Sequence, residues 1–178
     1  MARINPAAAH EVQASVQVAL ERYRAISGWQ PVISNTRATL AYSVAAFEVY
    51  AKLEPLFEEL QKILGTKEAA LYAYNISLTT GCAVCAAYFK KILIENNVST
   101  DDVYRFSAKE KELINFGNAV AKYHGHIADH VYNGLAGYYS KKEMVVLIAF
   151  AGQLIAVTIF NNTVETEIDE HLVPYALK

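Results

Sequence analysis

The stretch from position 79 to position 90 reads Thr79-Thr80-Gly81-Cys82-Ala83-Val84-Cys85-Ala86-Ala87-Tyr88-Phe89-Lys90 and holds both cysteines of the chain. Two threonines and a glycine interrupt the helical pattern that precedes them, and an apolar run suited to a helix follows. The stretch therefore predicts a helix that opens with a C-x-x-C pair, formed by Cys82 and Cys85.

The spacing of this pair suits reversible thiol chemistry. On a helix, residues i and i+3 share a face, and their Cβ atoms are about 5–6 Å apart. The Cα separation of such a pair then falls near the range of about 4.4–6.8 Å that a disulfide tolerates. We expect Thr79 or Thr80 to cap the helix and Gly81 to let the chain turn into it. Cys82 would then lie in the first turn, where the helix dipole favours a thiolate, so we expect it to be the more acidic thiol.

Two other interpretations of the pair stay open. Free cysteines are often small apolar core residues without chemistry. A structural zinc site usually needs four cysteine or histidine ligands, which here would require His124, His126 and His130 from a distant part of the chain. Their spacing matches no usual zinc signature, so we expect surface or capping histidines and predict no metal and no cofactor.

Composition excludes several classes of protein. The chain of 178 residues has 53% hydrophobic residues and a formal net charge of −2, which suits one folded domain and argues against a nucleic-acid partner. Two cysteines do not make a disulfide scaffold, so we expect a reducing, cytoplasmic location. The N-terminus lacks the apolar core of a signal peptide. The apolar run 144–160 is short and contains polar residues, so we expect no membrane span.

Hydrophobic periodicity predicts an all-α fold, because no segment alternates as a strand would. Helices are expected over 10–26, 35–52, 55–64, 66–78, 82–96, 107–124, 129–137 and 140–164, with a short turn at 103–104. We expect N-caps at Asn35 or Thr36, at Thr66 and at Asp129, and capping boxes at Ser107 with Glu110 and at Ser140 with Glu143. The segment 165–178 is expected to be a tail that packs on a neighbouring chain.

The final helix is apolar on more than one face, which exceeds what one subunit core uses. Its apolar residues are Val145, Val146, Leu147, Ile148, Phe150, Leu154, Ile155, Val157 and Ile159. This pattern predicts a homo-oligomer.

The layout resembles the carboxymuconolactone decarboxylase and alkylhydroperoxidase D-like superfamily over residues 34–169. The likeness rests on Ser77 before Gly81-Cys82-Ala83-Val84-Cys85, and on Tyr138-Tyr139-Ser140-Lys141-Lys142-Glu143-Met144-Val145 leading to Phe160-Asn161-Asn162. On this basis we expect a single all-helical domain with an N-terminal helix and connection (1–33), a family core (34–169) and a tail (170–178).

The resemblance implies an alkylhydroperoxidase D-like helical bundle assembled as a trimer or hexamer. It further implies a peroxidase or disulfide reductase with an antioxidant role, which takes its electrons from a thiol donor that the sequence does not identify. Of Cys82 and Cys85, one would attack the peroxide or accept electrons, and the other would resolve the intermediate as an intramolecular disulfide. No membrane or nucleic-acid partner is implied.

Two positions depart from the redox branch of this superfamily. Ala70 stands where that branch carries a glutamate, and Phe89 stands where it carries a histidine. Loss of a positioned general base costs roughly 10²–10⁴-fold in rate, so we expect weak peroxidase activity.

Two alternative functions stay open. One is a non-redox, decarboxylase-like enzyme or ligand-binding oligomer with a pocket formed by Tyr72, Tyr74 and Tyr88. The other is a structural protein with inert thiols.

Overall fold

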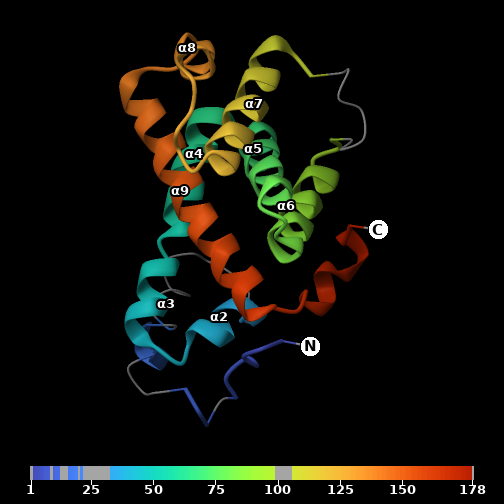
Figure 1. Cartoon of the computed structure of the whole chain (residues 1–178). Coiled ribbons are helices and arrows are strands. Elements are labelled where there is room, and N and C mark those ends of the chain that lie inside the picture. The colour runs from blue at the N-terminus through green and yellow to red at the C-terminus, as the bar shows by residue number, and fades with distance from the viewer. Residues whose placement is uncertain are drawn as a thin grey trace.

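The computed structural model of the chain describes residues 2–8, 10–12, 16–19, 21, 33–98 and 106–177. These residues form helices and no strand, which confirms the all-α prediction (Figure 1). The helices are α2 (Asn35–Leu40), α3 (Val44–Tyr50), α4 (Leu53–Leu64), α5 (Thr66–Thr79), α6 (Ala83–Glu95), α7 (Ala108–Lys122), α8 (Asp129–Ala136) and α9 (Lys141–Val164), followed by the 3₁₀ helix η2 (Glu170–Tyr175).

Helix α5 lies at the centre of the main core and packs against α4, α6, α7 and α9. It is buried around most of its circumference because small residues such as Ala69 and Ala73 let the neighbouring helices approach. The ring of Tyr72 fills the space beside Gly117 of α7, where a Cβ atom would lie 2.8 Å from the ring. The Tyr72 hydroxyl donates to the Leu147 carbonyl of α9 at 3.3 Å. These contacts fix α5 and its C-terminal end relative to α9.

Helix α9 is the longest element, with 24 residues, and it begins at the predicted capping box of Ser140 and Glu143. It is long and apolar enough to cross a membrane by length and composition, and no other helix among the described residues is. Its buried positions, such as Phe150 and Leu154, lie in the main core. The helix therefore has the packing of a core helix, while Val145 and Ile159 are exposed on its outer side.

A Schellman motif joins α5 to α6. The backbone N–H of Gly81 donates to the Leu78 carbonyl, and the N–H of Cys82 donates to the Ser77 carbonyl. Gly81 has a φ of +68°, the left-handed conformation that this motif requires. The turn delivers Cys82 directly to the start of α6.

Replacing Gly81 by alanine is expected to lower the free energy of unfolding by about 1–2 kcal/mol. A Cβ atom at this position would meet no other atom within 4 Å, so the cost arises from the left-handed backbone alone. The matched control is Gly152→Ala in α9, where a Cβ atom is equally unobstructed and where alanine should stabilise by about 0.5–1 kcal/mol. Urea unfolding measures both, and equal effects of the two substitutions would contradict the prediction.

Several predicted boundaries are wrong. The single helix expected over 35–52 is two helices, because the Ser43 side chain accepts from Ala46 N–H and starts α3 anew. The cap of α2 is Ser34, and α5 and α8 begin after Gly65 and Ala128 rather than at side-chain caps from Thr66 and Asp129.

The sequence predicts a helix at the N-terminal end of the chain and a tail at its C-terminal end. The tail packs through η2 on α6 of its own chain. The helix predicted over 10–26 is helical at 16–19 and 21, but residues 10–12 form a turn and a bend instead. Positions 13–15, 20 and 22–26 of that prediction, like the turn at 103–104, lie outside the described residues.

Helices α2 and α3 rest on a second, smaller hydrophobic cluster beside the main core. Its buried members are Val16, Ala19, Leu40, Ala41 and Phe47. Figure 1 shows α2 and α3 at the end of α9 that lies farthest from α8. Polar contacts attach α2 to the C-terminal part of the chain, since Asn35 N–H donates to Asp169 Oδ1 at 2.8 Å. Helices α2 and α3 and the C-terminal segment thereby line one cavity beside α6.

Candidate active site

The two cysteines lie together at the N-terminus of α6 as free, buried thiols, with Cys82 1% and Cys85 6% exposed. Cys82 is itself the N-cap of α6, and its Sγ accepts a hydrogen bond from Cys85 N–H at 3.3 Å. The expected cap at Thr79 or Thr80 is therefore wrong, because both residues belong to the end of α5. The thiol of Cys82 takes the role that a serine or aspartate oxygen usually has.

The side-chain amide of Asn161 bridges the two sulfurs from α9. Its Nδ2 lies 3.4 Å from Cys85 Sγ and 3.8 Å from Cys82 Sγ. Its Oδ1 accepts a hydrogen bond from the hydroxyl of Thr36 in α2 at 2.9 Å. This bond orients the amide so that the N–H groups, and not the oxygen, face the thiols. A buried amide donor aimed at two sulfurs favours a thiolate there.

The two thiols differ in acidity. Hydrogen bonding from the Cys85 thiol, supported by backbone N–H groups and by Asn161, lowers the pKa of Cys82 although burial opposes this. The same thiol–thiol hydrogen bond, with burial and the neighbouring charge, raises the pKa of Cys85. This direction agrees with the expectation that Cys82 is the more acidic thiol. The pair can therefore hold one proton and one negative charge between its sulfurs.

A large cavity of about 1630 Å³ borders Cys85 and is lined by Val84 and Cys85 of α6. Its walls come from α2, α3, α4, α6, α9 and η2, and its apolar lining includes Phe47, Tyr50, Phe57, Tyr88, Phe89 and Leu154. The volume exceeds the roughly 300–1,000 Å³ of typical small-molecule pockets. A small organic molecule would thus find room beside Cys85.

The structure separates the other residues singled out in the sequence. Tyr88 lines the cavity, whereas Tyr72 and Tyr74 are buried in the main core. His124, His126 and His130 are exposed, and no group of three metal-binding side chains occurs among the described residues. Ala70 is buried, and Phe89 packs its ring against Phe57 at 5.4 Å.

The sequence analysis used Asn161 only as part of the block that carries the family resemblance and Thr36 only as a possible helix cap, and it predicted no contact of either residue with the thiols. Asn161 carried a signal, because it continues the buried stripe of Phe150, Leu154 and Val157 at helical spacing, where a polar residue needs a partner. Thr36 carried none, since its hydroxyl reaches Asn161 only because the tertiary fold brings α2 close to α9.

Replacing Asn161 by aspartate is expected to slow alkylation of Cys82 at neutral pH by about tenfold or more. A carboxylate beside the sulfurs opposes the thiolate, which raises its pKa and lowers the reactive fraction. Iodoacetamide labelling of the native protein, followed by mass spectrometry, measures the rate. The matched control is Asn162→Asp, whose exposed side chain donates to the Thr80 carbonyl instead. The interpretation fails if the two variants react at the same rate.

Fold and site together define an all-α protein with a reduced, buried C-x-x-C pair beside a large, mostly apolar cavity. No protein-family profile and no curated protein matches the sequence.

Solved structures of the debrominase Bmp8 are similar in fold. The apo form has a TM-score of 0.75 at 15% identity, covering 97% of this chain and 95% of that chain. A cysteine-to-alanine variant of Bmp8 in complex with 2,3,4-tribromopyrrole has a TM-score of 0.73 at 15% identity, covering 97% of this chain and 94% of that one. Identity at this level establishes the likeness of fold alone.

Proposed function

We propose that this protein is a thiol-dependent oxidoreductase of the alkylhydroperoxidase D-like type, in which Cys82 and Cys85 cycle between dithiol and disulfide. The observation that carries the proposal is the Asn161 amide, which lies within hydrogen-bond distance of both sulfurs. A structural cysteine pair needs no such donor, whereas a pair that must stabilise a thiolate does. The opposite pKa shifts of the two thiols support the same conclusion.

The proposed reaction reduces a peroxide or a disulfide by two electrons. With a peroxide ROOH, one thiolate attacks the distal oxygen, the O–O bond breaks, and the departing alkoxide takes up a proton from solvent and leaves as ROH. The resulting sulfenic acid is attacked by the second thiol, which forms the Cys82–Cys85 disulfide and releases water. With a disulfide substrate, the same thiols exchange through a mixed disulfide. An external thiol donor then restores the dithiol.

A second candidate is the reductive removal of a halogen from an aromatic molecule. The apolar cavity beside Cys85 and the likeness to a debrominase crystallised with a bromopyrrole favour it. The balance is ArBr plus two thiols giving ArH, bromide, a proton and the disulfide. The pair supplies both electrons, so no redox cofactor is needed.

The test is a redox titration followed by a single-turnover assay. The protein is equilibrated in glutathione buffers, and the Cys82–Cys85 disulfide is quantified by mass spectrometry. Reduced protein without donor is then mixed with cumene hydroperoxide, with oxidised glutathione or with 2,3,4-tribromopyrrole. We expect one disulfide to form per molecule of product with at least one of these oxidants.

The matched control is protein whose thiols have been alkylated after mild unfolding and refolding. It should give no product. Thiols that stay reduced in every buffer, or that react only after denaturation, would overturn the proposal and favour the ligand-binding or structural alternatives.

We also propose that the protein assembles as a homo-oligomer. Support comes from exposed apolar residues on the outer side of α9, among them Val145, Ile148 and Ile159. Light scattering coupled to size-exclusion chromatography tests this, and a monomer at micromolar concentration would contradict it.

A further inference from the structure

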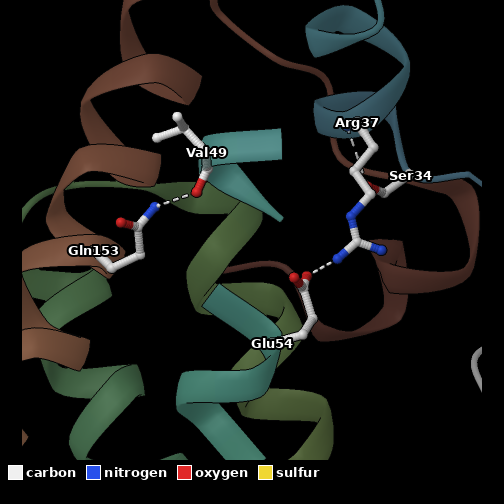
Figure 2. Close-up of polar contacts among 5 residues, drawn as sticks. All are labelled: Ser34, Arg37, Val49, Glu54 and Gln153. Atoms are coloured by element: carbon white, nitrogen blue, oxygen red, sulfur yellow. Dashed lines mark hydrogen bonds and ion pairs between the residues drawn. The ribbon is translucent and has the colours of Figure 1, made fainter. Parts of the chain in front are cut away.

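Helix α2 has only six residues and is held in place by polar contacts with other parts of the chain. Its Arg37 forms an ion pair with Glu54 of α4, and the Ser34 side chain caps the helix by accepting from Arg37 N–H at 3.4 Å, as Figure 2 shows. At the start of the helix, Asn35 N–H donates to Asp169 Oδ1 at 2.8 Å. A helix this short is not stable by itself, so the position of α2 depends on these contacts.

The ion pair anchors α2 to α4 without bringing a net charge to the site. The side chains of Arg37 and Glu54 are both only 18% exposed, so water and salt screen their attraction less than that of a surface pair. Among the described residues, no charged side chain apart from the thiols themselves shifts the pKa of Cys82 or Cys85. The pair therefore bears on the thiols through the position of α2 and not through its charges.

Thr36 connects α2 to the thiols through a single side chain. Its hydroxyl donates to Asn161 Oδ1 at 2.9 Å, and Asn161, which is 3% exposed, holds Nδ2 within 3.4 Å of Cys85 Sγ and 3.8 Å of Cys82 Sγ. An asparagine amide has one acceptor end and one donor end. Because the Thr36 hydroxyl takes the acceptor end, the donor end is left for the sulfurs. An amide turned the other way would point its oxygen at the sulfurs and oppose a thiolate.

We propose that α2 regulates the reactivity of the thiol pair, with Thr36 and the Arg37–Glu54 pair as positioning residues that act through Asn161. While α2 is in place, the amide donates to the sulfurs and favours a thiolate. When α2 shifts, the amide turns and the thiols become less reactive. Thr36, Arg37 and Glu54 also line the cavity that Cys85 borders, so a molecule in the cavity lies against the regulating helix.

The inference deepens the proposed function and rests on it only where it makes thiol acidity a control of turnover. The acidity itself is measured without any substrate, from the ultraviolet absorbance of the thiolate as a function of pH. The blank is the double variant Cys82→Ser with Cys85→Ser, because the chain has no other cysteine. No reagent has to enter the buried site, so a change of access does not alter the result.

Replacing Thr36 by valine keeps the size of the side chain and removes the donor. We expect the thiol titration to move to higher pH, with a thiolate fraction about fivefold smaller below the midpoint, because the amide is no longer held with its donors toward the sulfurs. Thr36→Ser keeps the hydroxyl and should restore the wild-type titration. The matched control is Thr39→Val in the same helix, whose buried hydroxyl donates to the Asn35 carbonyl at 2.8 Å instead. It should leave the titration unchanged.

Two further variants locate the route from α2 to the sulfurs. In an Asn161→Ala background, Thr36→Val should have no additional effect, because Thr36 acts only through the amide. The double variant Arg37→Met with Glu54→Leu replaces the ion pair by apolar residues, an exchange that folded proteins often tolerate, and it leaves the net charge of the chain unchanged. We expect it to move the titration in the same direction as Thr36→Val, with a thiolate fraction about twofold smaller.

The regulation is overturned if Thr36→Val titrates like the wild-type protein, if Thr36→Ser shifts the titration as far as Thr36→Val, or if the shift persists without Asn161. A wild-type titration in the ion-pair variant would overturn the role of Arg37 and Glu54. None of these results depends on the glutathione equilibration or on turnover of an oxidant. Failure of the regulation and failure of the proposed thiol chemistry are therefore distinguished by separate measurements.

Discussion

Replacing Cys85 by serine is expected to reduce peroxide- or disulfide-dependent turnover to the uncatalysed background. A serine hydroxyl cannot form a disulfide, so a single remaining thiol cannot complete the two-electron cycle. Cys82 is the more acidic thiol, and we therefore expect the Cys85→Ser protein to accumulate one oxidised adduct on Cys82. Intact-mass spectrometry after one equivalent of oxidant measures this adduct.

The reciprocal variant and a control complete the prediction. Cys82→Ser should also lose turnover, and its remaining Cys85 thiol should be oxidised more slowly, because burial still raises the pKa of Cys85 when the Cys82 thiol is absent. Ala83→Ser introduces a serine at the exposed first residue of α6, directly after Cys82, and should retain turnover. Undiminished activity of either cysteine variant would sink the dithiol mechanism.

Replacing Phe150 by alanine is expected to lower the free energy of unfolding by about 3–5 kcal/mol. Phe150 is fully buried in α9, and its ring centroid lies 5.6 Å from that of Phe57 and 6.2 Å from that of Tyr72. Alanine would leave a cavity between α4, α5 and α9, which the rigid packing of Tyr72 against Gly117 cannot close.

Urea unfolding at a fixed protein concentration measures this loss, because stability depends on concentration in an oligomer. The control is Ile94→Ala in α6, whose side chain is 47% exposed, and which should change stability by less than about 0.5 kcal/mol. Comparable losses in the two variants would contradict the assignment of Phe150 to the core.

The fold could be predicted where the determining interactions are local. Ser107 with Glu110 and Ser140 with Glu143 satisfy each other within one turn, and both capping boxes form as expected. Proline in the first turn and glycine after the last residue likewise mark the two ends of α4. The break at Ser43 escaped prediction, because the periodicity of Leu40, Val44 and Phe47 fits one helix as well as two.

The candidate site could be predicted only where its residues are close together in the sequence. Cys82 and Cys85 are neighbours in sequence, so their spacing alone indicates a pair. Asn161 reaches them from 76 residues beyond Cys85, and Arg37 of α2 meets Glu54 of α4 only through the tertiary fold. Contacts of this kind depend on how helices pack, and a single sequence contains no periodicity that reports them.

The division of the hydrophobic interior into two clusters has a consequence for how molecules enter the cavity. Helices α2 and α3 rest on the smaller cluster, and they join the rest of the chain largely through side-chain contacts such as Thr36 with Asn161. Units with few buried contacts detach at a lower free energy than the whole domain unfolds. Amide protons of α2 and α3 should therefore exchange with deuterium sooner than those of α5, and brief detachment of this unit would admit a substrate while the main core stays folded.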